Sequence, residues 1–276
     1  MIKLLNDCKY FNIVILALND CFNELNIPNT IVNEIIPNDI NLYIICTTHQ
    51  LQYFPKNYIS YNFEQLTTDK KWSSQFFNNL RNAKQVWDYS LENIKVLNTY
   101  KINTIHLPLG YNKTMEYNKN NDIKTIDYSF IGCLNETRIN KLKNLINIYY
   151  KSPEKILITN DCWDFNIYNK IKIGINLHFY KGNTILEIHR IILMIANKVY
   201  VLSETSDDKW YDEIYSNMIK FINTQNKNEL VNVGLEFLRK PINEQKNILD
   251  LNYNYLKTNC LYLNYIKLVY KDLIFN

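Results

Sequence analysis

The sequence predicts an α/β fold made of two Rossmann-like domains. Short apolar runs alternate with amphipathic segments, this alternation restarts after a polar stretch near the middle, and one part reads as a complete strand–loop–helix–strand unit. A chain of 276 residues is long enough for two domains of ordinary size. We therefore expect a first domain over residues 1–120 and a second over residues 121–276, with the last helix packing back on the first domain.

The composition indicates a folded protein of a reducing compartment. Hydrophobic residues make up 47%, and the net charge is only +4, without a dense block of Lys or Arg that would indicate nucleic-acid binding. The six cysteines form no CxxC pair and are expected as free thiols. Neither a membrane span nor a signal peptide is predicted. We therefore expect a cytoplasmic location. Tyr, Asn, Ile and Lys are abundant while Gly and Ala are scarce, which indicates AT-rich coding, as in some viruses, and for a viral chain the expected location is the host cytoplasm.

Apolar runs in the first half indicate strands joined by two helices. An uninterrupted run such as Phe11–Leu18 is typical of a strand buried on both faces. Ser90 is placed to cap a helix over Leu91–Thr99, and another helix is predicted over Trp72–Ala83. The other predicted strands are Ile31–Ile36, Asn41–Thr47, Lys56–Asn62, Gln85–Trp87 and Ile105–Leu107.

The polar, low-complexity stretch Met115–Lys124 is the predicted linker, and the same pattern resumes after it. The complete strand–loop–helix–strand unit lies in this second half. Its first strand is Ile171–Leu177, its loop contains Gly182, and its second strand is Val199–Leu202. The other predicted elements are strands Tyr128–Ile131, Ile156–Thr159 and Met218–Ile222, helices Arg138–Tyr150, Lys227–Arg239 and from Ile242 onward, and an apolar near-helical tail Tyr255–Phe275.

This unit places a loop and the first turns of a helix at one edge of a parallel sheet, where unpaired N–H groups and the helix dipole favour anions. Arg190 opposes that dipole, so its position indicates either a diphosphate ligand or an i,i+3 ion pair with Glu187. Glu187 has two interpretations as well. Thr184-x-x-Glu187 fits a capping box, and the same carboxylate could accept hydrogen bonds from a ribose.

Five strings, taken in order, resemble a glycosyltransferase of the GT-B type from a bacterial and giant-virus-like group. The resemblance implies two Rossmann-like domains facing each other across a cleft, with a nucleotide-sugar donor bound mainly by the second. The strings are HQL…YFPKNYISYNFEQL (His49–Leu66), VWDYSLENI (Val86–Ile94), LPLGY (Leu107–Tyr111), SFIGCLNETR (Ser129–Arg138) and INLHFYKGNTILEIHRI…VLSETSDD (Ile175–Asp208).

The resemblance implies a UDP- or GDP-sugar as donor substrate, with no further cofactor, and it favours ribose binding by Glu187. It also implies that Arg138 neutralises the donor phosphates, although a solvated surface arginine fits the sequence equally. Gly132 ends a strand where a side chain would block a phosphate, and any tight turn would also favour glycine. The donor-binding residues expected are Gly132, Arg138, His178, Gly182, Glu187, Arg190, Ser203 and Glu204.

In the first half, His49 directly follows a predicted strand and is the candidate base for an acceptor hydroxyl, with a structural loop histidine as the alternative. Glu64 is the rival base or an acceptor ligand. No Asp-x-Asp metal motif is present, so we expect metal-independent transfer of a sugar to a glycan or another hydroxyl acceptor. The alternative is a non-catalytic nucleotide- or glycan-binding protein, because Ile195 stands where many retaining GT-B enzymes carry a second glutamate.

Overall fold

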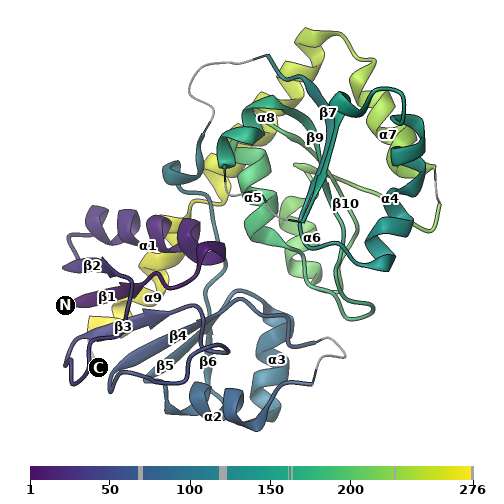
Figure 1. Ribbon diagram of the computed structural model, residues 1–276. Coiled ribbons are helices and arrows are strands. Elements are labelled where there is room, and N and C mark those ends of the chain that lie inside the picture. The colour runs from purple at the N-terminus through teal and green to yellow at the C-terminus, as the bar shows by residue number, and fades with distance from the viewer. Residues whose placement is uncertain (68–70, 118–122, 161, 163, 227, 275–276) are drawn as a thin grey trace. The chain divides into compact units, whose positions relative to one another are not determined.

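The computed structural model describes residues 1–67, 71–117, 123–160, 162, 164–226 and 228–274. The chain forms two compact units (Figure 1). The first unit is Met1–Thr114 together with Leu261–Asn276, and the second is Met115–Cys260. Every described strand belongs to one of two parallel sheets, of six and five strands, one in each unit.

The first unit is a Rossmann-like domain with the strand order β2-β1-β3-β4-β5-β6. Because the chain runs from β1 to β2 in one direction and from β3 to β6 in the other, right-handed crossovers put α1 on one face of the sheet and α2 and α3 on the other. Its elements are β1 (Ile2–Leu5), α1 (Asn12–Glu24), β2 (Asn29–Val32), β3 (Leu42–Ile45), β4 (Tyr58–Asn62), α2 (Ser74–Asn82), β5 (Gln85–Asp88), α3 (Leu91–Thr99), β6 (Thr104–His106) and α9 (Tyr262–Ile274).

The predicted strand Phe11–Leu18 is wrong, because this run forms the first turns of α1. The helix packs against β1, β2 and α9, so residues on most of its circumference are buried, including Ile13, Val14 and Ile15 in succession. A helix covered on several sides needs the same uninterrupted apolar run as a strand buried on both faces. The first strand of the chain is instead the short segment β1.

The remaining strands and helices predicted for the first half are confirmed, with ends shifted by a few residues. The helix α3 has the predicted bounds, and Ser90 caps it as expected. Its hydroxyl accepts hydrogen bonds from the backbone N–H groups of Glu92, at 3.1 Å, and Asn93, at 3.4 Å. The cap fixes the direction in which the chain leaves β5.

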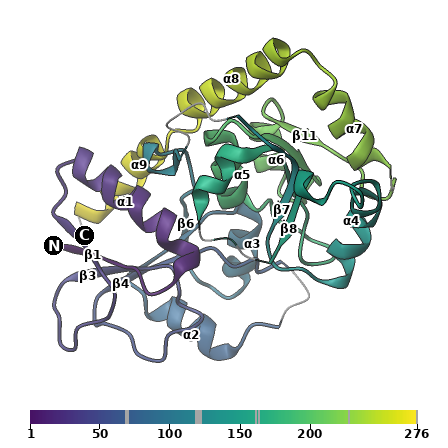
Figure 2. The ribbon, with the colours of Figure 1, turned by 45° about the horizontal axis from the view of Figure 1, so that its top comes forward.

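The second unit has the strand order β11-β10-β9-β7-β8, with β9 at its centre. Figures 1 and 2 show α4 and α7 on one face of this sheet and α5 and α6 on the other. Its elements are β7 (Ile126–Ile131), α4 (Glu136–Ile148), β8 (Ile156–Thr159), β9 (Ile171–Asn176), α5 (Ile188–Ala196), β10 (Tyr200–Ser203), α6 (Lys209–Tyr215), β11 (Ile219–Phe221), α7 (Glu229–Leu238) and α8 (Ile242–Asn259).

Tight packing holds α5 against the centre of the second sheet. A Cβ atom on Gly174, in β9, would lie 2.1 Å from the sulfur of Met194 in α5, so only glycine allows this approach. On the opposite face, Tyr128 and Phe130 of β7 pack in a core with Phe237 of α7. The first turn of α5 is therefore held at the end of β9.

The apolar tail is two helices, where the sequence indicated one near-helical segment. The first, α8, ends at Asn259, and α9 starts at Tyr262. The backbone N–H of Tyr262 donates to the carbonyl of Tyr111 at 2.8 Å, and its hydroxyl lies 3.2 Å from that of Tyr61, so α9 belongs to the first unit. Residues 118–122 of the predicted linker lie outside the described residues, as does Phe275. No helix in the described ranges is long and apolar enough to cross a membrane.

Candidate functional site

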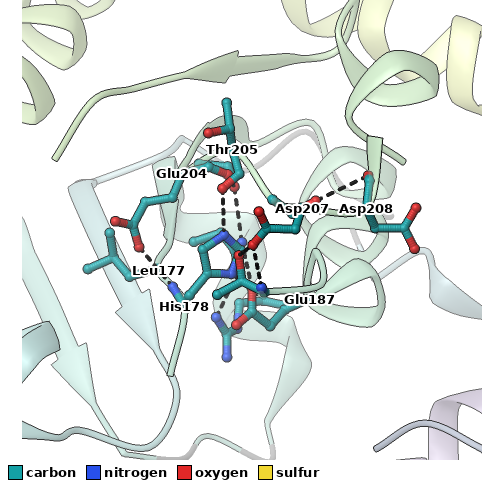
Figure 3. A network of polar contacts seen from close by, with 12 residues as sticks. Leu177, His178, Glu187, Glu204, Thr205, Asp207 and Asp208 are labelled. Carbon is teal, nitrogen blue, oxygen red and sulfur yellow. Dashed lines mark hydrogen bonds and ion pairs between the residues drawn. The ribbon is translucent and has the colours of Figure 1, made fainter. Parts of the chain in front are cut away.

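Polar side chains gather where β7, β9 and β10 end, and we call this place the carboxyl edge of the second sheet (Figure 3). Asn176, the last residue of β9, is the centre of the group. Its Nδ2 donates to Glu187 Oε2 and to Ser203 Oγ, at 3.0 Å each. Its Oδ1 accepts from Arg190 Nη1 at 2.8 Å. One buried amide thus connects β9 with the start of α5 and the end of β10.

Glu187 lies at the N-cap position of α5, which overturns the capping-box prediction. The helix begins at Ile188, and the Glu187 side chain makes no capping hydrogen bond. Thr184 instead lies in the preceding loop, where its backbone N–H donates to Asp207 Oδ2 at 2.7 Å. Because Asp207 fixes this loop from the segment after β10, the helix starts three residues later than the sequence pattern indicated.

The carboxylate of Glu187 is buried among positive charges. Its Oε2 lies 3.1 Å from His178 Nδ1, and its Oε1 lies 3.5 Å from Arg138 Nη2. Burial raises the pKa of Glu187, but the charges of His178, Arg190 and Arg138 outweigh this effect and lower it to about 2. Glu187 is therefore ionised at neutral pH. Among the described ion pairs, none joins Glu187 to Arg190.

His178 connects the loop after β9 with the segment after β10. Its backbone N–H donates to Glu204 Oε2 at 2.9 Å, and its Nε2 lies 2.9 Å from the carbonyl oxygen of Thr205. Burial lowers the pKa of His178, but the charge and contact of Glu187, together with Glu204, raise it overall above its usual value. The imidazole therefore binds the protein on both sides.

Arg138 is a buried anchor, so the alternative of a solvated surface arginine is wrong. Only 2% of the residue is exposed. Its Nε and Nη2 donate to the carbonyl of Leu177, at 3.1 and 2.5 Å, and its Nη1 donates to the carbonyl of Cys133 at 2.6 Å. Burial and the charge of Arg190 lower its pKa to about 10, so it stays charged. It fixes the loops that follow β7 and β9.

Arg190 and Gly132, predicted from separate motifs, lie directly against each other. A Cβ atom on Gly132 would come within 2.7 Å of Arg190 Nη2, and the backbone there has a φ of 158°. The guanidinium also lies over the ring of Phe130, 5.6 Å from its centroid. It is half-buried. Gly182, by contrast, is exposed, with a φ of 67°, and no neighbouring atom lies within 4 Å of where a Cβ atom would be.

Ser203 and Glu204 direct their polar atoms toward the protein. Ser203 is buried, and its hydroxyl donates to the Glu204 carbonyl at 2.8 Å. The Glu204 carboxylate pairs with Lys141 Nζ at 2.5 Å and accepts from the Thr224 hydroxyl. Reasoning from the sequence did not identify Asn176 or Lys141. The position of Asn176 at a strand end, two residues before His178, was a signal that could have identified it.

A second polar pair lies at the carboxyl ends of β3 and β4 in the first unit. His49 Nε2 is 3.3 Å from Glu64 Oε1, with the two side chains 15% and 22% exposed. The amide of Gln50 lies 2.8 Å from the same nitrogen, and Trp72 meets the imidazole edge to face. The structure thus joins two residues that the sequence presented as rival bases.

Buried amides hold the Glu64 segment in place. Asn93 donates to the Glu64 carbonyl at 2.7 Å and to Asp88 Oδ1 at 3.0 Å. Asn62 donates to Asp88 Oδ2 at 2.7 Å and to the Glu64 carbonyl at 3.1 Å. Asp88 is fully buried, so its carboxylate orders the ends of β4 and β5. Within the described ranges, no group of three or more His, Cys, Asp or Glu side chains is arranged to hold a metal ion.

No protein-family model and no curated protein matches this sequence. Solved structures match along the whole chain. HepE from Anabaena, in complex with UDP and glucose, is 9% identical, with a TM-score of 0.62 over 99% of this chain and 98% of that one. T4 phage BGT, in complex with UDP and Mn²⁺, is 12% identical, with a TM-score of 0.59 over 99% of each chain. A glycosyltransferase from Rickettsia africae is 12% identical, with a TM-score of 0.56 over 100% and 98%.

These likenesses and the two parallel sheets show that the chain has two Rossmann-like domains and the GT-B type of fold, as the sequence predicted. At such low identity they show the fold alone.

Proposed function

We propose that this protein is a glycosyltransferase that moves a sugar from a nucleotide diphosphate donor to an acceptor hydroxyl. The observation that carries the proposal is the position of Arg190 against Gly132, at the carboxyl edge of the second sheet. No Glu187 ion pair neutralises this arginine among the described contacts, and its guanidinium is half-buried. Such a group suits two-point contact with a diphosphate. Two structures of the same fold contain UDP, which makes a UDP-sugar the first donor to test, before a GDP-sugar.

Burial divides the expected donor-binding residues into two groups. We assign Arg190, Gly132 and the exposed Gly182 loop to contact with the donor. The other five have their polar atoms engaged within the protein, so we assign them to holding the site in shape, which revises the direct contacts expected from the sequence. These are Arg138, His178, Glu187, Ser203 and Glu204.

We assign the acceptor side to the His49–Glu64 pair. His49 takes the proton of the acceptor hydroxyl while that oxygen bonds to the anomeric carbon of the donor sugar, and the bond from this carbon to the diphosphate breaks. Glu64 orients the imidazole and stabilises its charged form. Arg190 stabilises the negative charge that develops on the leaving diphosphate. Because this fixed cation serves the leaving group, we propose that transfer needs no metal ion, so EDTA leaves the rate unchanged.

A thermal-shift panel of UDP-, GDP-, dTDP- and CMP-sugars tests donor binding. We expect the melting temperature to rise with a diphosphate-linked sugar, and no rise with any member of the panel contradicts the proposal. Hydrolysis or transfer of the stabilising donor then tests catalysis. Binding without turnover for a range of hydroxyl acceptors would support a non-catalytic binding protein instead.

A further inference from the structure

The surroundings of His178 favour its doubly protonated form. The carbonyl oxygen of Thr205 can only accept a hydrogen bond, so the Nε2 that lies 2.9 Å from it carries a proton. Nδ1 lies 3.1 Å from a carboxylate oxygen of Glu187, and a lone pair there would face a negative charge. Nε2 thus faces a carbonyl acceptor, and Nδ1 is buried 3.1 Å from a carboxylate oxygen with no other partner among the described residues, so the nearby negative charge favours a proton on Nδ1 as well.

The charged groups around His178 come from three elements. Glu187 faces it from the start of α5, and Glu204 faces it from the segment after β10. Arg138 of α4 shares Glu187 with it, and Lys141 of α4 pairs with Glu204. Arg190 of α5 adds a positive charge near Glu187. Two carboxylates and three basic groups therefore surround His178. The Glu187 carboxylate contacts the imidazole, and the Glu204 carboxylate contacts the backbone N–H of the same residue.

The pairing of Glu187 with His178 determines which groups Arg190 can bind. Glu187 and Arg190 are three residues apart at the start of α5, a spacing at which a glutamate and an arginine commonly pair. In the structure, Glu187 pairs with His178 and Arg138, while Arg190 turns to Asn176 and to the space beside Gly132. We propose that His178 is a charged positioning residue that engages Glu187 and thereby leaves Arg190 to bind the diphosphate of the donor. This inference rests on the proposed function.

When His178 loses its proton, it no longer keeps Glu187 from pairing with Arg190. A neutral imidazole no longer balances the buried Glu187 carboxylate, whose next available cation is Arg190. An Arg190 paired with Glu187 binds a diphosphate less well. Affinity for UDP is therefore full while His178 is charged and falls as the pH rises through its pKa, which Glu187 holds above the usual value of 6.5.

Calorimetric titration with UDP, across pH values from about 6 to 9, tests the proposal. We expect His178→Gln to weaken UDP binding about tenfold at neutral pH and to remove most of its pH dependence. His106→Gln is the matched control, because His106 lies on β6 of the first unit and has no assigned role in donor binding, and it leaves both unchanged. The double variant His178→Gln with Glu187→Gln is decisive. It frees Arg190 again and restores most of the affinity, whereas a purely structural role for His178 predicts further loss.

A ¹⁵N NMR titration of the wild-type imidazoles covers the case in which these variants fail to fold. We expect both His178 nitrogens to carry protons at pH 7, with a higher titration midpoint than that of His189. A neutral His178 at pH 7, or unchanged UDP affinity in the folded His178→Gln protein, overturns the inference. Absence of UDP binding at any pH contradicts the proposed function instead, and the NMR titration still reports the charge of His178.

Discussion

His49 Nε2 lies 3.3 Å from Glu64 Oε1, so two residues that follow adjacent parallel strands form a pair at the carboxyl edge of the first sheet. A carboxylate beside an imidazole fixes the orientation of the ring and stabilises its protonated form. The arrangement is that of a histidine base with an orienting acid. Its position on ordered strand ends, held by Asn93 and Asp88, suits a catalytic group.

Replacing His49 by alanine removes the proposed base. We expect kcat to fall by about 10²- to 10⁴-fold with little change in the donor KM, because the donor is bound by the second unit. Glu64→Gln keeps the shape but loses the charge, so its kcat falls less. Initial-rate kinetics measure both. His106→Gln is the control, since His106 binds the Tyr89 carbonyl and has no assigned role in the chemistry. Equal rates in His49→Ala and the wild type would rule out this base.

Gly132→Ala tests whether a glycine at this position is needed to leave room for the Arg190 guanidinium. The new methyl group would lie 2.7 Å from Arg190 Nη2, so the guanidinium has to move. We expect about tenfold weaker UDP binding. The protein still folds, because the displaced group is the end of a flexible side chain, but it is less stable, because the φ of 158° strains an alanine backbone. Calorimetry of Gly132→Ala, Arg190→Ala and the double variant measures the coupling. If the two effects simply add, Gly132 acts independently of Arg190.

Glu187→Gln tests the buried charge network. The change leaves His178 and Arg138 without their counter-charge, so we expect the free energy of unfolding to fall by about 3 kcal/mol. Since the pKa of Glu187 is lowered from 4.5 to about 2, its stabilising effect is full above pH 4.5 and is lost as the pH falls toward 2.

Urea unfolding at neutral pH and between about pH 5 and 3 measures both effects. Acid should destabilise the variant less steeply than the wild type over this range. The exposed Glu236→Gln variant, on α7, should keep both the stability and the acid dependence of the wild type. A Glu187→Gln protein with the acid dependence of the wild type would show that Glu187 titrates normally.

The rate of alkylation of Cys133 measures donor binding at the second sheet. Its thiol is exposed and directly follows Gly132 at the carboxyl edge of the second sheet. At a UDP concentration ten times Kd, we expect alkylation of Cys133 to slow by about tenfold, because only the free protein reacts. Mass spectrometry after limited labelling measures the rate, with Cys8 of the first unit as the internal reference. Equal protection of both thiols would indicate a general change in the protein rather than local coverage.

The sequence was informative where the pattern had a local cause. Ser90 capped its helix as expected, because a cap is decided by neighbours two and three residues away. The run Phe11–Leu18 was misassigned because complete burial gives the same pattern in a helix and in a strand. The capping box at Thr184 failed because Asp207, 23 residues later, binds that loop.

The candidate site was predicted as residues but not as a network. Gly132 and Arg190 were found from separate strings, and their contact depends on the adjacency of β7 and β9, which no local pattern states. The same holds for His49 and Glu64, which the neighbouring strands β3 and β4 bring together. Arg138 is buried only because of tertiary packing. From sequence alone, an arginine is expected at the surface, since most arginines in proteins are exposed.

The central claim is that Arg190 holds the diphosphate of a nucleotide donor. The most direct measurement is calorimetric titration of UDP into the wild type and Arg190→Ala, with the exposed Arg239→Ala as the matched control. A charge-assisted contact of about 1.5–3 kcal/mol predicts that Arg190→Ala binds UDP about 10- to 150-fold more weakly, while Arg239→Ala binds it as the wild type does. Equal UDP affinity in the wild type and the folded Arg190→Ala protein would contradict the claim.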